Sequence, residues 1–147
     1  MSTCTPDLAQ LAQSIKIWGQ ELGFAHVGIA GVDLGEHEHH LQRWLDAGYQ
    51  GEMEYLGAHG SKRSHPDQLI PGTVRVVSLR MDYLSGDTQM AQRLAQPEKA
   101  YISRYALGRD YHKLVRKRVQ FLADRIQEAI GPFGYRAFVD RAPVLEK

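Results

Sequence analysis

Cysteine is almost absent from this chain: Cys4 is the only one among its 147 residues. One thiol cannot close an intramolecular disulfide, nor can it supply the ligands of a cysteine-based zinc site or an iron–sulfur cluster. Long apolar runs are missing as well, since none approaches the roughly 18 residues of a membrane-spanning helix. The first residues, MSTCTPDLAQ, lack the basic and apolar stretches of a signal peptide. We therefore expect a cytoplasmic protein with no membrane partner.

The composition is that of a globular domain. Hydrophobic residues make up 43% of the chain and charged residues 24%, which excludes a collagen, a disordered tail and a disulfide scaffold. A chain of this length buries about two-thirds of its unfolded surface in a single core. We therefore expect residues 1–147 to belong to one domain.

Charge is unevenly distributed, although the net charge is only +1. Residues 1–60 carry two basic and eight acidic residues, a net charge of −6, whereas residues 61–147 carry sixteen basic and nine acidic residues, a net charge of +7. The densest segment is 99–118, with seven basic residues against Asp110 alone. Such a cluster either neutralises the phosphates of a nucleic acid or forms a solvated helix face.

The apolar pattern predicts helices that alternate with strands. Apolar residues three or four positions apart predict a helix, whereas strict alternation predicts a strand. The predicted helices are residues 6–22, 35–47 and 110–130, and the predicted strands are residues 24–31, 73–83, 100–107 and 135–139. This order is typical of an α/β or α+β fold in which helices cover a small mixed sheet.

Common nucleotide and metal motifs do not explain the chain. Neither G-x-G-x-x-G nor a P-loop occurs. The segment GEHEHH (35–40) suits either a metal site or a polar first helical turn; we favour the turn and predict no metal ligands. Asp110-Tyr111-His112 lacks the glycine of the cobalamin motif that supplies an axial histidine, so we interpret His112 as a hydrogen-bonding or packing residue.

Two charged residues stand where a chemical role is conceivable. Asp140 follows the predicted strand 135–139, so its carboxyl can project into a cleft, where partial burial would suit it to donate a proton. The alternative is an aspartate that caps a turn before Pro143. Arg63 lies in a polar loop, where it either holds a carbonyl or phosphate through charge-assisted hydrogen bonds or is a plain surface charge.

Three stretches together resemble the N-terminal part of the epoxyqueuosine reductases. They are GYQGEMEYL (48–56), ISRYALGRDYHKLVRKR (102–118) and FVDRAPVLEK (138–147). The combination R-Y-A-x-G-x-D-Y-H in the middle stretch is the most specific part. The resemblance implies an enzyme that reduces the epoxide of epoxyqueuosine at the wobble position of tRNA, giving queuosine. It also implies a nitroreductase-like or flavin-reductase-like domain that binds cobalamin, with electrons from two [4Fe–4S] clusters.

The resemblance also implies roles for individual residues, motif by motif. Asp140, in V-D-x-A-P, matches the proton donor and faces cobalamin. Arg63 and Ser103 match residues that contact the corrin. Three further residues would line the same cleft or contact the anticodon loop of the tRNA: Tyr105, Arg109 and His112.

The family's proteins continue past the matched stretches with a glycine-rich segment, eight cluster cysteines and helical repeats. We therefore expect residues 1–147 to be an incomplete cobalamin-binding domain, monomeric, inactive alone and dependent on an electron donor elsewhere. Two alternatives stay open: a non-catalytic RNA-binding module that uses residues 99–118, and a flavin-dependent reductase.

Overall fold

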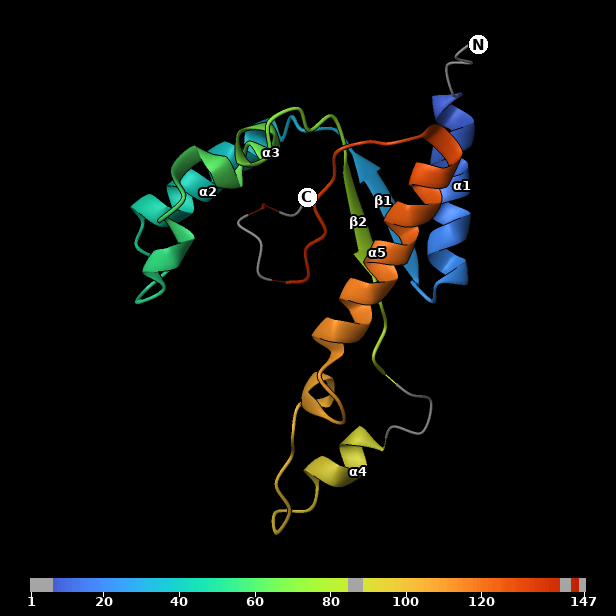
Figure 1. Ribbon diagram of the computed structural model, residues 1–147. Helices are drawn as coiled ribbons and strands as arrows, with labels where there is room; N and C mark the ends of the chain where they lie inside the picture. The colour runs from blue at the N-terminus through green and yellow to red at the C-terminus, as the bar shows by residue number, and fades with distance from the viewer. Residues whose placement is uncertain (1–6, 85–88, 141–143, 146–147) are drawn as a thin grey trace, which may run out of the picture. The chain divides into compact units, whose positions relative to one another are not determined.

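A computed structural model describes residues 7–84, 89–140 and 144–145 (Figure 1). Within these ranges the chain contains both helices and strands, as the sequence predicts for an α/β or α+β protein. In chain order the elements are α1 (Leu8–Glu21), β1 (His26–Ala30), α2 (Glu36–Asp46), the 3₁₀ helices η1 (Glu54–Leu56) and η2 (Gly60–Arg63), α3 (Pro66–Leu69), β2 (Val76–Arg80), α4 (Met90–Leu94), the 3₁₀ helix η3 (Arg104–Ala106) and α5 (Tyr111–Ile130).

The sheet is smaller than the sequence predicts. Among the described residues it consists of β1 and β2, which run antiparallel (Figure 1). The backbone N–H of Ala25, next to β1, donates to the carbonyl of Arg80 in β2 over 2.8 Å. The predicted mixed sheet is therefore wrong for the described part of the chain.

Two predicted strands are not formed. Residues 100–107 contain η3 instead, and residues 135–139 adopt no regular element. Alternation favours a strand only when one face of it becomes buried against a core. Tyr101 is 41% exposed and Tyr105 57%, so the alternating tyrosines of the first segment have no such face.

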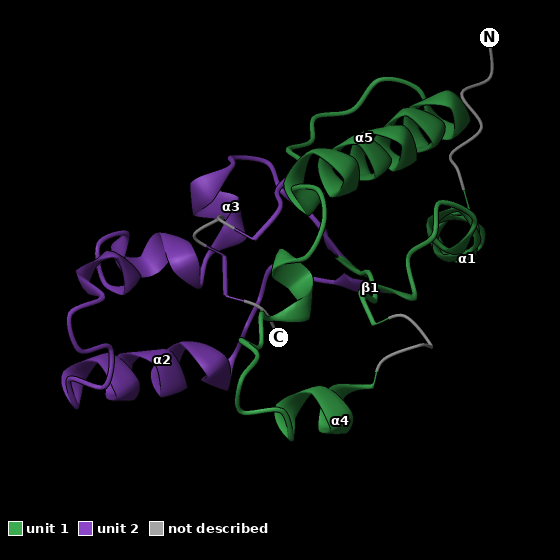
Figure 2. Ribbon diagram, turned by 90° about the horizontal axis from the view of Figure 1, so that it is seen from below, with its two compact units in different colours: residues 1–27, 79–137 green, residues 28–78, 138–147 purple. Residues whose placement is uncertain are grey.

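The chain divides into two compact units (Figure 2). Unit 1 comprises residues 1–27 and 79–137, and unit 2 comprises residues 28–78 and 138–147. The boundary falls within both strands, so β1 and β2 each contribute residues to both units.

Helices α1 and α5 pack together in unit 1. The absence of a side chain at Gly19 lets α1 approach β1 closely, because a Cβ there would lie 2.4 Å from Cγ2 of Val27. Arg125 of α5 joins the two helices at their surface, with its Nη1 2.6 Å from Oε2 of Glu21 in α1. The buried apolar side chains of unit 1 are Ile15, Phe24, Val27, Leu122, Ala123 and Ile126.

Aspartates begin and glycines end the two longest helices. Asp7 caps α1 by accepting from the backbone N–H of Ala9 and Gln10, and Asp110 caps α5. Gly23 and Gly131 follow these helices with φ of 87° and 85°, a backbone conformation that glycine adopts without strain. None of the helices among the described residues combines the length and apolar character that crossing a membrane requires.

Candidate functional site

Arg63 ends η2 in unit 2, and its side chain fastens this turn to the preceding one. Its Nε donates to the carbonyl of Leu56 over 3.1 Å, and its Nη2 donates to the carbonyl of Tyr55 over 3.3 Å. Both acceptors belong to η1. The protein therefore uses two of the five N–H donors of the guanidinium, and Arg63 is half-buried rather than a plain surface charge.

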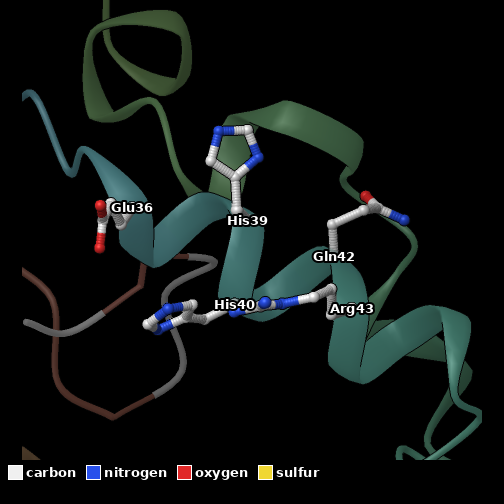
Figure 3. Close-up of a pocket in the computed structure, with 5 residues that line it drawn as sticks. All are labelled: Glu36, His39, His40, Gln42 and Arg43. Atoms are coloured by element: carbon white, nitrogen blue, oxygen red, sulfur yellow. The ribbon is translucent and has the colours of Figure 1, made fainter.

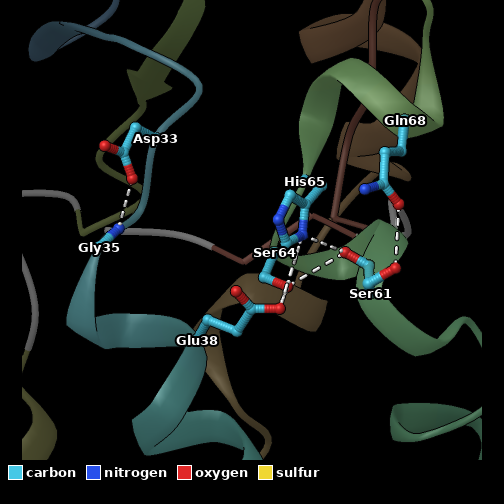
Figure 4. A network of polar contacts seen from close by, with 7 residues as sticks. All are labelled: Asp33, Gly35, Glu38, Ser61, Ser64, His65 and Gln68. Atoms are coloured by element: carbon cyan, nitrogen blue, oxygen red, sulfur yellow. Dashed lines mark hydrogen bonds and ion pairs between the residues drawn. The ribbon is translucent and has the colours of Figure 1, made fainter.

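A polar network around Ser64 anchors the same turn to α2 (Figure 4). Ser64 is only 4% exposed, and its hydroxyl donates to Oε1 of Glu38 over 2.9 Å. Nδ1 of His65 lies 2.9 Å from the carbonyl of Ser61 and 3.5 Å from Oε1 of Glu38. A buried hydroxyl that donates to a carboxylate is one of the stronger hydrogen bonds of a protein, so this network fixes where η2 lies on α2.

The segment that carries Asp140 returns to this turn. The backbone N–H of Leu145 donates to the carbonyl of Arg63 over 2.8 Å. Leu145 and Arg63 both belong to unit 2. Asp140 itself is exposed, which makes the predicted partial burial wrong. The reason is that no strand forms over 135–139 to carry its side chain into a cleft. Its φ is 57°, the one positive value among the described residues other than glycine.

Ser103, Tyr105 and Arg109 lie in unit 1, in the segment that precedes α5. All three are exposed. The neighbouring Arg104 is half-buried, and its Nε is buried without a hydrogen-bond partner among the described residues. The predicted site residues therefore divide between the units, with Arg63 in unit 2 and these three in unit 1.

His112 is held by the cap of its own helix. Oδ1 of Asp110 accepts from the backbone N–H of His112 over 3.0 Å and lies 2.6 Å from Nδ1 of the ring. The ring of Tyr111 stacks on the imidazole, with centroids 4.3 Å apart and planes 21° from parallel. The interpretation of His112 as a hydrogen-bonding residue is confirmed.

The electrostatics of this pair follow from its geometry. The backbone N–H of His112, and then its ring, hold the pKa of the Asp110 carboxyl below its usual range. A carboxyl with a depressed pKa stabilises the folded chain at any pH above its unfolded pKa. That contribution is lost as the pH falls through the folded pKa, so neutral solution keeps the pair intact.

Four of the seven basic residues of 99–118 lie on α5, and they separate into two groups. Lys113, Arg116 and Lys117 are exposed, and their spacing of three and four places them on one side of the helix. Arg118 is half-buried, with its Nη1 3.7 Å from the sulfur of Met81. The structure therefore removes Arg118 from the solvated side of α5 and leaves Lys113, Arg116 and Lys117, here called the basic face.

Two hollows lie in unit 2. One, of about 560 Å³, is lined by Glu36, His39, His40, Gln42 and Arg43, all of which project from α2 (Figure 3). The other, of about 360 Å³, lies between α2 and residues 50–64. The described residues contain no group of three or more histidine, cysteine or acidic side chains arranged to hold a metal ion. His39 and His40 of GEHEHH line the first hollow and are exposed.

Cobalamin, which the resemblance implies, does not fit either hollow. A ligand pocket normally encloses most of its ligand, and a corrin with its nucleotide tail exceeds both volumes. Neither hollow is lined by Arg63, Ser103 or Asp140. Neither of these two hollows is therefore a corrin pocket.

Two features of the site were missed at the level of sequence. The hydrogen bond between Ser64 and Glu38 joins residues 26 positions apart, and no local sequence pattern predicts this contact. The contact between Asp110 and the ring of His112 had a signal, because an N-cap aspartate accepts from the residue two positions later. A histidine at that position can present its ring to the same carboxylate.

Comparison with known proteins gives one consistent family. A family model described as "Epoxyqueuosine reductase QueG, DUF1730" matches residues 63–141, more than half of the chain. The chain is 75% identical over 142 residues to the epoxyqueuosine reductase of Pseudomonas aeruginosa, which covers 97% of this chain and 39% of that protein.

More distant relatives agree. The chain is 56% identical over 141 residues to the epoxyqueuosine reductase of Vibrio cholerae and 52% identical over 141 residues to that of Escherichia coli. These matches cover 96% of this chain, and 38% and 37% of the two relatives. The chain thus spans about two-fifths of the length of the curated relatives it matches. No solved structure matches it.

Proposed function

Because this chain belongs to the epoxyqueuosine reductase family, we propose that it supplies part of the site at which such an enzyme reduces epoxyqueuosine to queuosine at the wobble position of tRNA. The observation that carries the proposal is the extent of the family match. Residues 63–141 include every residue of the predicted site: Arg63, Ser103, Tyr105, Arg109, His112 and Asp140.

Asp140 is the proposed proton donor. Converting an epoxide to a double bond breaks two carbon–oxygen bonds, consumes two electrons and two protons, and releases the oxygen as water. Negative charge develops on the oxygen as the first of these bonds breaks, so an acid within hydrogen-bond reach lowers the barrier. The left-handed backbone at Asp140 supports this role, because strained conformations of residues other than glycine cluster at functional sites.

The chain's own residues leave two requirements unmet. The electrons come from outside the chain, since Cys4 cannot hold an iron–sulfur cluster alone. Cobalamin would supply the reducing chemistry when bound, and its contacts with Arg63 and Ser103 remain predictions. Every step assigned to this chain is therefore a proton transfer or a binding contact.

The basic face of α5 is the proposed contact for tRNA. Lys113, Arg116 and Lys117 can neutralise phosphates, and the exposed Tyr105 can stack on an unpaired base. Replacing all three cations with glutamine is expected to weaken RNA binding. The plot of log affinity against log salt concentration is expected to become less steep by about two. Fluorescence anisotropy with an anticodon stem-loop, measured at several salt concentrations, gives this slope.

The matched control for the basic face is Lys16→Gln. Lys16 is an exposed lysine on α1, so its loss changes the net charge without touching α5. Equal slopes for the triple variant and the parent chain would contradict an RNA contact at the basic face. RNA binding by this face in a chain that supports no turnover in any context would favour the alternative of a non-catalytic RNA-binding module.

The proposed function is tested in a chimeric enzyme. This is the Pseudomonas aeruginosa epoxyqueuosine reductase with its 142 matched residues replaced by those of the present chain. We expect turnover within about tenfold of the parent enzyme, because the two sequences are 75% identical over the exchanged segment. Loss of turnover in a folded chimera that still binds tRNA would contradict the proposal.

A further inference from the structure

A directional contact holds the turn that carries Arg63 to α2. It is the hydrogen bond from the hydroxyl of Ser64 to Oε1 of Glu38, 2.9 Å long. Ser64 is 4% exposed and directly follows Arg63, whereas Glu38 lies in the first turn of α2. The two residues are 26 positions apart, so the bond joins segments that the chain does not hold together locally.

The donors and acceptors of the network determine the direction of this bond (Figure 4). The Ser64 hydroxyl has one hydrogen and two acceptors within reach, Oε1 of Glu38 at 2.9 Å and the carbonyl of Ser61 at 3.0 Å. Nδ1 of His65 faces the same two acceptors at 3.5 Å and 2.9 Å, so this nitrogen carries a hydrogen and supplies the nearer one, the carbonyl. The hydroxyl is then left for the carboxylate, and hydrogen bonds to a charged group are the stronger ones.

Farther along α2 the contact with the same stretch of chain is apolar. Cδ2 of Leu45 lies 3.9 Å from the position that a Cβ on Gly57 would take, and an apolar contact has no preferred direction. Both contacts border the hollow of about 360 Å³. The walls of a hollow lack packing partners on one side, so fewer atoms oppose a shift of the turn. The directional bond to Glu38 is therefore what fixes the turn on α2.

Two groups of Arg63 depend on the position of this turn. Its guanidinium donates to the carbonyls of Leu56 and Tyr55, and its backbone carbonyl accepts from the N–H of Leu145 over 2.8 Å. That carbonyl belongs to the peptide group that joins Arg63 to Ser64, and a peptide group is planar. A shift of Ser64 therefore moves the acceptor of the Leu145 bond directly.

We propose that Glu38 is a positioning residue for Arg63, acting through the hydroxyl of Ser64, and that it keeps the Arg63 carbonyl in place for Leu145. Glu38 lies outside residues 63–141, the part of the chain that the family model matches. The positioning role stands on contacts within unit 2. Its consequence for turnover rests on the proposed function, which places Arg63 in the site.

The test is the proton chemical shift of the Leu145 amide in the full 147-residue chain, measured by NMR. In Glu38→Ala the Ser64 hydroxyl can still donate to the carbonyl of Ser61, so η2 is expected to stay formed but to lose its place on α2. We expect the Leu145 amide to move toward the shift of an unbonded amide. The N–H of Ser64, which bonds to Ser61 within the turn over 3.1 Å, is expected to keep its shift. Glu38→Gln retains an acceptor oxygen, so it is expected to restore most of the parent shift at Leu145.

The matched control is Glu36→Ala, which removes the other carboxylate from the first turn of α2 and is expected to leave the Leu145 amide unchanged. An unchanged Leu145 shift in Glu38→Ala would overturn the proposal. If α2 unfolds in that variant, Ser64→Ala removes the same bond from the side of the turn, and an unchanged Leu145 shift there would overturn it as well. The double variant is expected to shift Leu145 no further than either single one, because both remove one interaction; summed shifts would contradict the link through Ser64.

The same substitutions in the chimeric enzyme separate the positioning role from the proposed function. Glu38→Ala is expected to lower kcat by about tenfold or more, since a small misplacement of a site residue is enough for such a loss, and Glu38→Gln is expected to recover it. A shifted Leu145 amide with unchanged kcat and KM supports the positioning role and contradicts the place of Arg63 in the proposed function. An unchanged Leu145 amide overturns the positioning role, whatever the turnover.

Discussion

The variant Asp140→Asn of the chimeric enzyme is expected to lose turnover by about 100-fold or more, within the range that general acids contribute. Asparagine has nearly the same shape as aspartate, but its amide does not give up a proton to the departing epoxide oxygen. The loss is therefore expected in kcat, with tRNA affinity unchanged. A steady-state assay over a range of tRNA concentrations separates kcat from KM.

Asparagine is the right replacement because of the backbone at this position. Asp140 has a φ of 57°, and asparagine tolerates the left-handed region better than any residue except glycine. Asp140→Ala would add backbone strain to the chemical change and blur the result. The matched control is Asp67→Asn, which removes an exposed carboxylate elsewhere in the same unit and is expected to leave turnover unchanged.

The second large effect concerns stability. Leu122 of α5 is 2% exposed in the core of unit 1. Leu122→Ala removes buried methyl groups and leaves a cavity, so we expect it to lower the free energy of unfolding by about 2–5 kcal/mol. Urea denaturation of the 147-residue chain, followed by circular dichroism, measures this loss.

The control for this variant lies on the same helix. Leu114 is 49% exposed, so Leu114→Ala is expected to change the free energy of unfolding by about 0.5 kcal/mol or less. Both variants exchange leucine for alanine within α5, which cancels differences of helix propensity. Equal losses for the two variants would mean that α5 does not bury Leu122 in a core.

The three longest helices, α1, α2 and α5, were predictable because their signals are local, whereas the short helices α3 and α4 were not predicted. In α5 the cap at Asp110, the apolar spacing that buries Leu122 and Ile126, and the stop at Gly131 all lie within the helix or next to it. These features act on neighbouring residues, so the sequence contains them directly. The prediction for 110–130 therefore agrees with α5 to within one residue at its start.

The strands were less predictable because a strand depends on a neighbour. Residues 73–83 pair over Val76–Arg80, where β1 provides a partner. Residues 100–107 and 135–139 were also predicted as strands but do not pair in the described structure. The alternation of side chains predicts which face of a strand would be buried, but it does not predict which element would cover that face.

The candidate site could be predicted only in part. The local sequence pattern is compatible with an ordinary turn residue at Asp140 and a surface charge at Arg63. Their functional roles were predicted from the resemblance to a family. The structure adds that the segment following Asp140 bonds to the carbonyl of Arg63 through Leu145. Long-range contacts of this kind leave no trace in composition or periodicity.

The most direct test of the proton-donor role is a mass-spectrometric count of the two nucleosides in tRNA. Epoxyqueuosine-containing tRNA is incubated with the chimeric enzyme, with its Asp140→Asn variant and with its Asp67→Asn variant, under the same supply of electrons. The proton-donor role predicts queuosine from the first and third reactions, and epoxyqueuosine left almost intact in the second. Full conversion by the Asp140→Asn variant at the parent rate would contradict it.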